Sequence, residues 1–243
     1  MLEEDGLATT QISLIRIHTE RIQPPRALWV PFELGRPFGV PSDPDFQKQV
    51  LAATFALFGS EHGPVLVDYP EDVPDSVSKP EPDATGMVCP IDLPTLPDPD
   101  APKSEIGQAL MKEANSLAPW YDLAVRNRAR TTVGASGLSP DAAARYLAAF
   151  LEDQATPAPR DDIPAGRVLK LVYEDLKAYY TEAITAQPGS ATSKQVEDWL
   201  FKETVLGKAL WTLRDVCRSS NDEYHRYLGR NSIVPDRQIN PST

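Results

Sequence analysis

Long apolar runs and export signals are missing from this chain of 243 residues. No apolar stretch approaches the ~18 residues that a membrane-spanning helix needs. The N-terminal stretch MLEEDGLATT is acidic and polar, whereas a secretory signal begins with basic residues followed by an apolar core. These absences predict a cytoplasmic protein with no membrane partner.

Positive charge is also scarce, because 24 Lys and Arg residues face 35 Asp and Glu residues and give a formal net charge of −11. Nucleic-acid-binding proteins usually present a basic face, and an acidic membrane surface repels a protein of this charge. The balance argues against nucleic acid and membrane as partners, although a local basic patch escapes such a count.

Cysteine is rare, and Cys89 and Cys217 match no metal-ligand spacing. Cysteines outside any disulfide framework fit a reducing cytosol. Cys89 is either a catalytic thiol or an inert one, and no His or Lys adjoins it to activate the thiol. Cys217 falls on the apolar stripe of a predicted helix, which favours a place in the core.

The first 70 residues carry the pattern of an α/β fold. Residues 7–17, 27–32 and 64–69 read as strands, and the second is apolar throughout, as in a strand covered on both faces. Between the last two strands a helix is predicted, with Ser42 as its cap and Pro44 in its first turn. The fold class predicted here is a partial parallel sheet with flanking helices.

The composition changes after this segment. Residues 68–105 contain nine prolines and ten acidic residues but only two lysines, which predicts an acidic, proline-rich arm or linker over residues 71–103. A mainly helical region is expected over residues 104–225, and a tail over 226–243. The expected helices begin near Ser104 and Ser139 and cover residues 165–185 and 192–220, the last two as a hairpin of long amphipathic helices.

Ionisable side chains gather at the predicted end of the first strand. Arg16, His18, Glu20 and Arg21 lie there, where open α/β sheets bind ligands. One interpretation makes His18 a general base held by Glu20, with Arg16 and Glu20 in contact with the substrate. The other interpretation is a solvated loop.

A second pair, Glu33 and Arg36, follows the second strand within PFELGRPFGVPSDPDFQ. Arg36 lies between Gly35 and Pro37, so a rigid guanidinium could hold a substrate carboxylate through two hydrogen bonds, with Glu33 as a catalytic group. The alternative is a structural ion pair that braces the turn.

One glycine-containing stretch, TTVGASGL at residues 131–138, precedes the helix that Ser139 is expected to cap. It lacks the full glycine pattern and the lysine of a P-loop. It is either an anion-binding loop at a helix N-terminus or, more simply, a connector between two helices.

The run PPRALWVPFELGRPFGVPSDPDFQKQVLAATFALF resembles a signature of the selenoprotein B subunits of glycine, sarcosine, betaine and D-proline reductases. The matching positions are Arg26, Pro31, Leu34, Gly35, Pro37, Gly39, Pro41, Asp45 and Gln47. The resemblance covers about residues 2–70.

The resemblance implies reductive chemistry by a selenol or a thiol, but that group lies upstream of the matched region, and Phe38 stands where some relatives have cysteine. Either another chain supplies the missing half, or the reading frame starts late, or the chemistry differs. A sheet that starts so abruptly would expose an edge, which favours a partner chain or a homo-oligomer.

Two functions are therefore expected. The first is a subunit of a selenoprotein B-like oxidoreductase complex that acts on a small amine- or carboxylate-bearing substrate. The second is a non-catalytic structural or regulatory subunit of a hetero-oligomer. The sequence names no cofactor and shows no metal motif.

Overall fold

The computed structural model describes all residues except 1, 40–42, 73–94, 99–100, 188–192 and 241–243. The chain forms two compact units, Met1–Pro80 and Glu81–Thr243, here called the N-terminal and the C-terminal unit. The division falls inside the arm that the composition marks at residues 71–103. Among the described residues, no helix combines the length and the apolar composition that crossing a bilayer demands.

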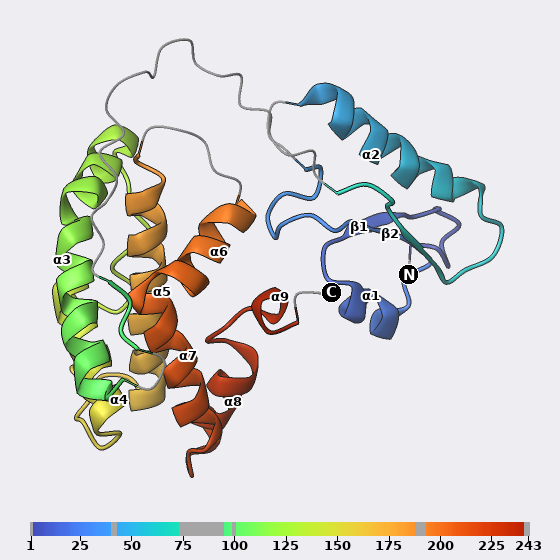
Figure 1. Ribbon diagram of the computed structural model, residues 1–243. Coiled ribbons are helices and arrows are strands. Elements are labelled where there is room, and N and C mark those ends of the chain that lie inside the picture. The colour runs from blue at the N-terminus through green and yellow to red at the C-terminus, as the bar shows by residue number, and fades with distance from the viewer. Residues whose placement is uncertain (1, 40–42, 73–94, 99–100, 188–192, 241–243) are drawn as a thin grey trace, which may run out of the picture. The chain divides into compact units, whose positions relative to one another are not determined.

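The N-terminal unit confirms the predicted α/β class. Three strands, β1 (Gln11–Ser13), β2 (Arg26–Trp29) and β3 (Val65–Asp68), form a parallel sheet in the order β1-β2-β3 (Figure 1). The helical elements are α1 (Arg16–Ile22), α2 (Pro44–Ala56) and the short 3-10 helix η1 (Leu57–Gly59). Two strands are close to their predicted positions, but the first is much shorter than residues 7–17 because α1 begins at Arg16.

One face of this sheet packs against α2. Phe46 and Val50 on α2 join Leu28 and Val30 on β2 in a small core, which Phe32 and Tyr69 extend through ring contacts with Phe46. Pro44 occupies the first turn as predicted. The cap is Asp43, whose carboxylate accepts a hydrogen bond from the Phe46 backbone N–H at 3.1 Å. The predicted cap, Ser42, lies outside the described residues.

The C-terminal unit is helical. Its elements are α3 (Lys103–Arg128), α4 (Pro140–Glu152), α5 (Ala165–Ile184), α6 (Ser193–Glu203), α7 (Val205–Arg218), α8 (Glu223–Asn231) and α9 (Asp236–Ile239). Figure 1 shows α3, α4 and α5 side by side, and residues from α3 to α9 contribute to one apolar core. Ser139 caps α4 as predicted, through a 3.3 Å hydrogen bond from the Ala142 N–H.

Helix α3 runs through Pro119 without a break. Two predictions about this unit are wrong in detail. The helix expected over 192–220 is two helices that meet at Thr204, so the expected hairpin of two long helices is absent. Residues 226–240 are no tail, because most of α8 and all of α9 fall there and Leu228, Ile233 and Val234 are buried. The apolar side chains in this segment have a core to enter, which local composition does not reveal.

Candidate functional site

The carboxyl ends of the three strands meet at one edge of the sheet. Parallel pairing places Ser13, Trp29 and Asp68 in register at the ends of β1, β2 and β3. Backbone hydrogen bonds continue past the strands, from Val30 N–H to the Ser13 carbonyl and from Tyr69 N–H to the Trp29 carbonyl. Side chains that follow these strands therefore share the position at which α/β sheets bind ligands.

At this edge an arginine bridges two carboxylates, forming what we call the Arg16 cluster (Arg16, Glu20 and Asp68). The Arg16 Nε donates to both carboxylate oxygens of Asp68, at 3.1 and 3.2 Å, and its Nη1 donates to Glu20. The hydrogen bond with Asp68 is the main reason that the pKa of Arg16 is raised. Since one guanidinium faces two carboxylates, the cluster suits a cation better than an anion.

The helix geometry overturns the predicted pairing of His18 with Glu20. Both residues lie on α1, where positions two apart point to different sides. Glu20 pairs with Arg16, four positions before it, and the exposed His18 side chain has no hydrogen-bond partner among the described residues. Arg21, in the last turn of α1, is also exposed.

The proline- and glycine-rich stretch after β2 forms two consecutive turns, here called the double turn (residues 31–39). The Arg36 N–H donates to the Glu33 carbonyl at 3.0 Å, and the Gly39 N–H donates to the Arg36 carbonyl at 2.9 Å. Gly35, third in the first turn, has φ of +87°, as a type II turn requires. Pro37 occupies the second position of the next turn, where its fixed φ is favourable.

Within the double turn, Glu33 and Arg36 face each other loosely. The Arg36 Nη1 lies 4.0 Å from the Glu33 Oε2, and the two side chains are 53% and 37% exposed. An exposed pair at this distance contributes little to stability. The guanidinium therefore remains open to a ligand, unlike that of Arg16. No contact joins this pair to the Arg16 cluster among the described residues.

Sequence reasoning missed Asp68, although the rule that selected Arg16 also applies to it. Asp68 ends β3 just as Ser13 ends β1, and the parallel register places the two strand ends along the same edge. In the sequence Asp68 opens the acidic, proline-rich stretch of residues 68–105, which conceals its position at a strand end. Arg26, by contrast, is structural, since it donates to the Ser60 carbonyl and pairs with Glu3 at 3.0 Å.

The loop at residues 131–138 connects α3 with α4, and its N–H groups donate hydrogen bonds to carboxylates of α5. The Ala135 and Ser136 N–H groups donate to Asp175, at 3.0 and 2.8 Å. The Thr132 N–H donates to Glu182 at 2.7 Å. Burial raises the pKa of Glu182, but the hydrogen bonds from the threonines outweigh it and the net pKa is lowered. The connector interpretation is therefore supported, because the protein itself fills the anion-binding positions.

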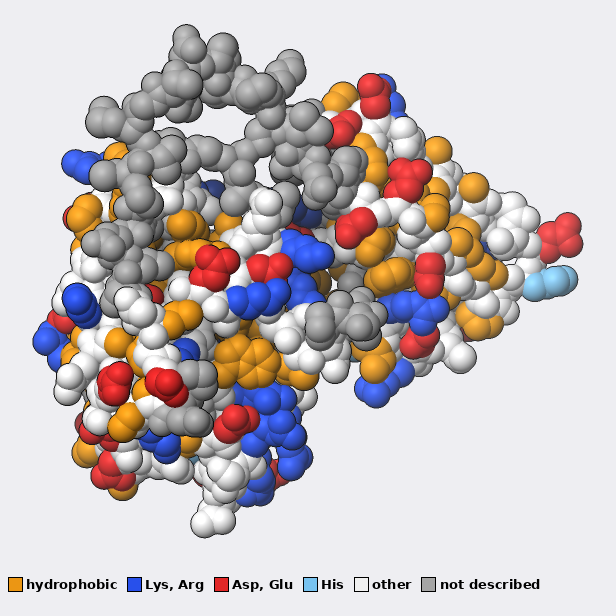
Figure 2. All heavy atoms as spheres, in the orientation of Figure 1, with side chains coloured by type: hydrophobic (Ala, Val, Ile, Leu, Met, Phe, Trp, Pro, Cys, Tyr) orange, Lys and Arg blue, Asp and Glu red, His pale blue; other side chains and the backbone are white. Residues whose placement is uncertain are grey.

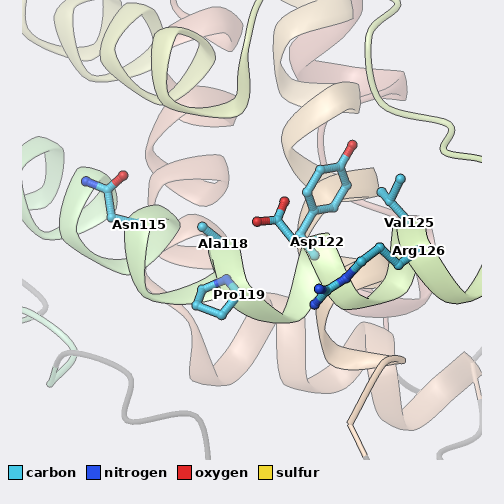
Figure 3. A pocket seen from close by; sticks show the side chains of 7 residues that line it. Asn115, Ala118, Pro119, Asp122, Val125 and Arg126 are labelled. Carbon is cyan, nitrogen blue, oxygen red and sulfur yellow. The ribbon is translucent and has the colours of Figure 1, made fainter.

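A shallow groove lies along α3, far in sequence from the predicted residues (Figure 3). It is lined by Asn115, Ala118, Pro119, Tyr121, Asp122, Val125 and Arg126. Pro119 has no N–H to donate to the Asn115 carbonyl, and its ring stands in the groove. All the lining residues come from one helix, so the groove encloses little and carries no evident chemistry.

Cys217 adds no catalytic group. Cys217 is 1% exposed in the core, and burial raises the pKa of its thiol to about 12. The prediction of a core cysteine is confirmed. Cys89 lies outside the described residues. Among the described residues, no group of three His, Cys, Asp or Glu side chains is placed to hold a metal ion.

Comparisons with protein-family models, with curated proteins and with solved structures found no match to this chain.

Proposed function

We propose that the chain is a subunit of an oxidoreductase complex of the selenoprotein B type, acting on a small amine- or carboxylate-bearing substrate. The observation that carries this proposal is the position of Arg36. It stands in the rigid double turn, at the ligand-binding edge of a parallel sheet, with its guanidinium exposed and only loosely paired. The redox cysteine or selenocysteine would come from outside the segment that resembles this family.

In this proposal Arg36 binds the substrate carboxylate through two parallel N–H donors. Glu33, 4.0 Å away, accepts a hydrogen bond from the substrate amine or takes its proton as the catalytic base. His18 acts as a second proton carrier. Arg16 and Glu20 contact the substrate from the cluster that Asp68 holds in place.

A second chain is favoured by the apolar side chains that the N-terminal unit leaves uncovered. On α1 the buried residue is Thr19, whereas Ile17 and Ile22 are 53% and 74% exposed. Phe55 and Phe58 stack on each other and are also exposed. A small unit that exposes several large apolar side chains and two sheet edges fits a subunit of a larger assembly.

The same surface supports a second candidate function, that of a non-catalytic structural or regulatory subunit. In that case the exposed isoleucines and phenylalanines assemble the complex, and Glu33 with Arg36 only braces the turn. Both functions place the protein in the cytoplasm with no nucleic-acid partner.

The substitution Arg36→Ala separates these two functions. We expect it to weaken the binding of glycine, betaine or proline roughly tenfold or more, because a charge-assisted hydrogen-bonded contact is lost. Titration calorimetry on the chain co-purified with the product of the neighbouring upstream gene measures this. Arg36→Lys should recover only part of the affinity, because lysine lacks the planar fork.

Arg21→Ala is the matched control, since Arg21 is also an exposed arginine of the N-terminal unit. Equal affinities for the parent chain, Arg36→Ala and Arg21→Ala would contradict the substrate-binding role. If the affinities are equal and Arg36→Ala also forms the complex normally by light scattering, the non-catalytic function becomes the better account.

A further inference from the structure

The outer edge of β3 carries main-chain groups that the sheet does not use. Strand β3 lies at one end of the order β1-β2-β3, and among the described residues no strand pairs with its other side. The Val65 and Tyr69 N–H groups donate to carbonyls within residues 25–29, on the side of β2. Backbone groups alternate in direction along a strand, so the N–H and C=O groups of Leu66 and Asp68 point outward from the sheet.

The side chains of this edge are mostly apolar. Val67 is 41% exposed and is in register with Leu28, which packs in the core beneath α2, so Val67 lies on the same face of the sheet as α2. The one charged residue of β3 is Asp68, and Arg16 donates to both of its carboxylate oxygens. The edge therefore combines outward main-chain groups with an exposed valine and a carboxylate whose charge is already balanced.

These main-chain groups specify the kind of partner. Outward N–H and C=O groups at the spacing of a strand form hydrogen bonds with another extended strand, as in β-strand addition. A two-fold axis brings the edge of a strand against the same edge of a second copy, in antiparallel orientation. We propose that two copies of this chain associate through their β3 strands, which joins their two sheets into one.

The hydrogen-bonding groups also select the register of this pairing. When Leu66 lies opposite Asp68 of the second copy, all the outward groups of both residues are used, in about four hydrogen bonds. Pro64 and Pro70, the next positions that direct their backbone outward, have no N–H, so the pairing stops there. The two-fold axis then passes beside Val67, and the two Val67 side chains face each other as a non-hydrogen-bonded pair.

Charge decides which of the two sheet edges accepts a second copy. In this register the two Asp68 side chains are diagonal neighbours, and each one is held by the Arg16 of its own chain, which limits their repulsion. The β1 edge is less suitable, because Glu3 accepts a hydrogen bond from the hydroxyl of Thr9, just before β1. This bond holds an acidic turn, residues 3–5, at the start of the strand, where two copies would repel each other.

The other exposed apolar side chains of this unit do not specify such a partner. Figure 2 shows hydrophobic side chains over α2, and Phe55 and Phe58 stack on each other there and at η1. Rings of this kind fit many apolar surfaces and carry no main-chain donors or acceptors. The β3 pairing is short and buries less than the ~1,200 Å² of a stable complex, so we expect a dissociation constant of roughly 10–100 µM.

Analytical ultracentrifugation of the full chain at concentrations from about 1 to 500 µM tests the proposal. We expect monomers at the low end and dimers at the high end. Val67→Lys places two ammonium groups face to face at the axis and should weaken dimerisation about tenfold or more. Val67→Thr keeps a neutral β-branched side chain and should change the dissociation constant by less than about threefold. Circular dichroism verifies that both variants are folded.

Gln49→Lys is the matched control, because Gln49 is exposed on α2 and the change in charge is identical. It should dimerise like the parent chain. Cross-linking gives an independent measurement in a Cys89→Ser background, with glutathione disulfide as the oxidant. Val67→Cys should form a covalent dimer, whereas Gln49→Cys should not. Cys217 should stay reduced, because its thiol is buried and burial raises its pKa.

Three results would overturn the proposal. The first is a parent chain that stays monomeric at every concentration, which would mean that the edge remains open or is filled from elsewhere. The second is equal dimerisation of Val67→Lys and Gln49→Lys. The third is a dimer that Phe55→Ser abolishes and Val67→Lys does not, which would assign the contact to the phenylalanines.

This inference goes beyond the proposed function, because it requires no substrate. Arg36→Ala should dimerise like the parent chain, since Arg36 lies in the double turn and not on β3. A failure of substrate binding with an intact dimer would therefore count against the proposed function alone. A monomeric chain that still binds substrate through Arg36 would count against the β3 pairing alone.

Discussion

At the scale of single residues, Gly39 shows why only glycine fits at the end of the double turn. Its φ is +83°, in the left-handed region that favours glycine, and an added Cβ would lie 2.5 Å from the Phe46 ring. Phe46 belongs to the small core of the N-terminal unit and contacts the Phe32 and Tyr69 rings. The turn that presents Arg36 is therefore fixed directly against the core.

Gly39→Ala should destabilise the N-terminal unit by about 1–3 kcal/mol, from left-handed strain and displacement of the Phe46 ring. Urea unfolding measures the change in the free energy of unfolding, and hydrogen exchange of the β2 amides reports on the N-terminal unit. Gly59→Ala is the control, because Gly59 has an ordinary φ and open space around its Cβ position, so a change within about 0.5 kcal/mol is expected. Equal effects of the two substitutions would contradict the account.

Glu113 is a second residue whose environment decides its behaviour. It is fully buried and accepts hydrogen bonds from the Val205 and Leu206 N–H groups, at 2.8 and 3.0 Å, and from the Tyr180 hydroxyl. It thereby satisfies the free N–H groups at the start of α7. Burial is the largest influence on its pKa and raises it, while these hydrogen bonds partly oppose the rise.

Because the pKa of Glu113 is raised in the folded state, folding favours binding of a proton to its carboxyl group. The stability that the protonated group contributes is fully present below the ordinary pKa of 4.5. It is lost as the pH rises through the pKa of the folded state. The stability advantage of the parent chain over Glu113→Gln should therefore shrink as the pH rises above 4.5. Chemical unfolding at a series of pH values measures it.

Glu182→Gln provides a control of opposite sign. The pKa of Glu182 is lowered, so its contribution is present above the ordinary value of 4.5 and is lost as the pH falls through the folded pKa. Its advantage over Gln should grow with pH in the acid range. Parallel pH profiles for the two variants would contradict both assignments.

At the scale of elements, the break between α6 and α7 has a local cause. The hydroxyl of Thr204 donates to the Leu200 carbonyl at 2.6 Å and accepts from the Gly207 N–H at 2.9 Å, so one side chain serves both helix ends. Gly207 then allows the start of α7 to pass close to Leu200 and Phe201. The apolar residues of this stretch recur with helical spacing, which conceals the break.

Thr204→Ala should lower the free energy of unfolding by about 1–2 kcal/mol, because the N-cap is lost in a buried position. Thr204→Ser keeps the hydroxyl and should retain most of the stability. Thermal and urea unfolding by circular dichroism compare the two. If the serine variant is as unstable as the alanine variant, the methyl group and not the hydroxyl makes the contribution.

At the scale of the whole molecule, the two units have separate cores. The core of the N-terminal unit is drawn from residues 12–69 and that of the C-terminal unit from residues 101–239. Each unit therefore buries its apolar side chains by itself. The C-terminal unit has the larger core, whereas the N-terminal unit leaves several large apolar side chains exposed.

A fragment of residues 95–243 should consequently fold alone, with a helical circular dichroism spectrum and a cooperative thermal transition. A fragment of residues 1–80 should be less stable and more prone to associate, because its three strands have two open edges. Light scattering and thermal unfolding of both fragments check this. If the C-terminal fragment does not unfold cooperatively, the C-terminal unit is not stable on its own and the division into two units has no counterpart in stability.

The sequence by itself determined the class of the N-terminal fold, the turn after its second strand, Pro44 in the first turn of α2 and Ser139 as the cap of α4. Strand composition, prolines, glycines and caps act over only a few residues. It also selected Arg16, Glu20, Glu33 and Arg36 at the edge of the sheet but not Asp68, because the rule for strand ends needs only the order of elements.

Only the tertiary structure decided which of these groups meet. Arg16 pairs with Asp68 across 52 positions in sequence. Glu20 pairs with Arg16 and not with His18. The burial of Glu113 under α7 likewise depends on two helices that are distant in sequence. Local patterns specify which face of an element is apolar, but the partner of a charged side chain is set by long-range packing, which a single sequence does not encode in any short motif.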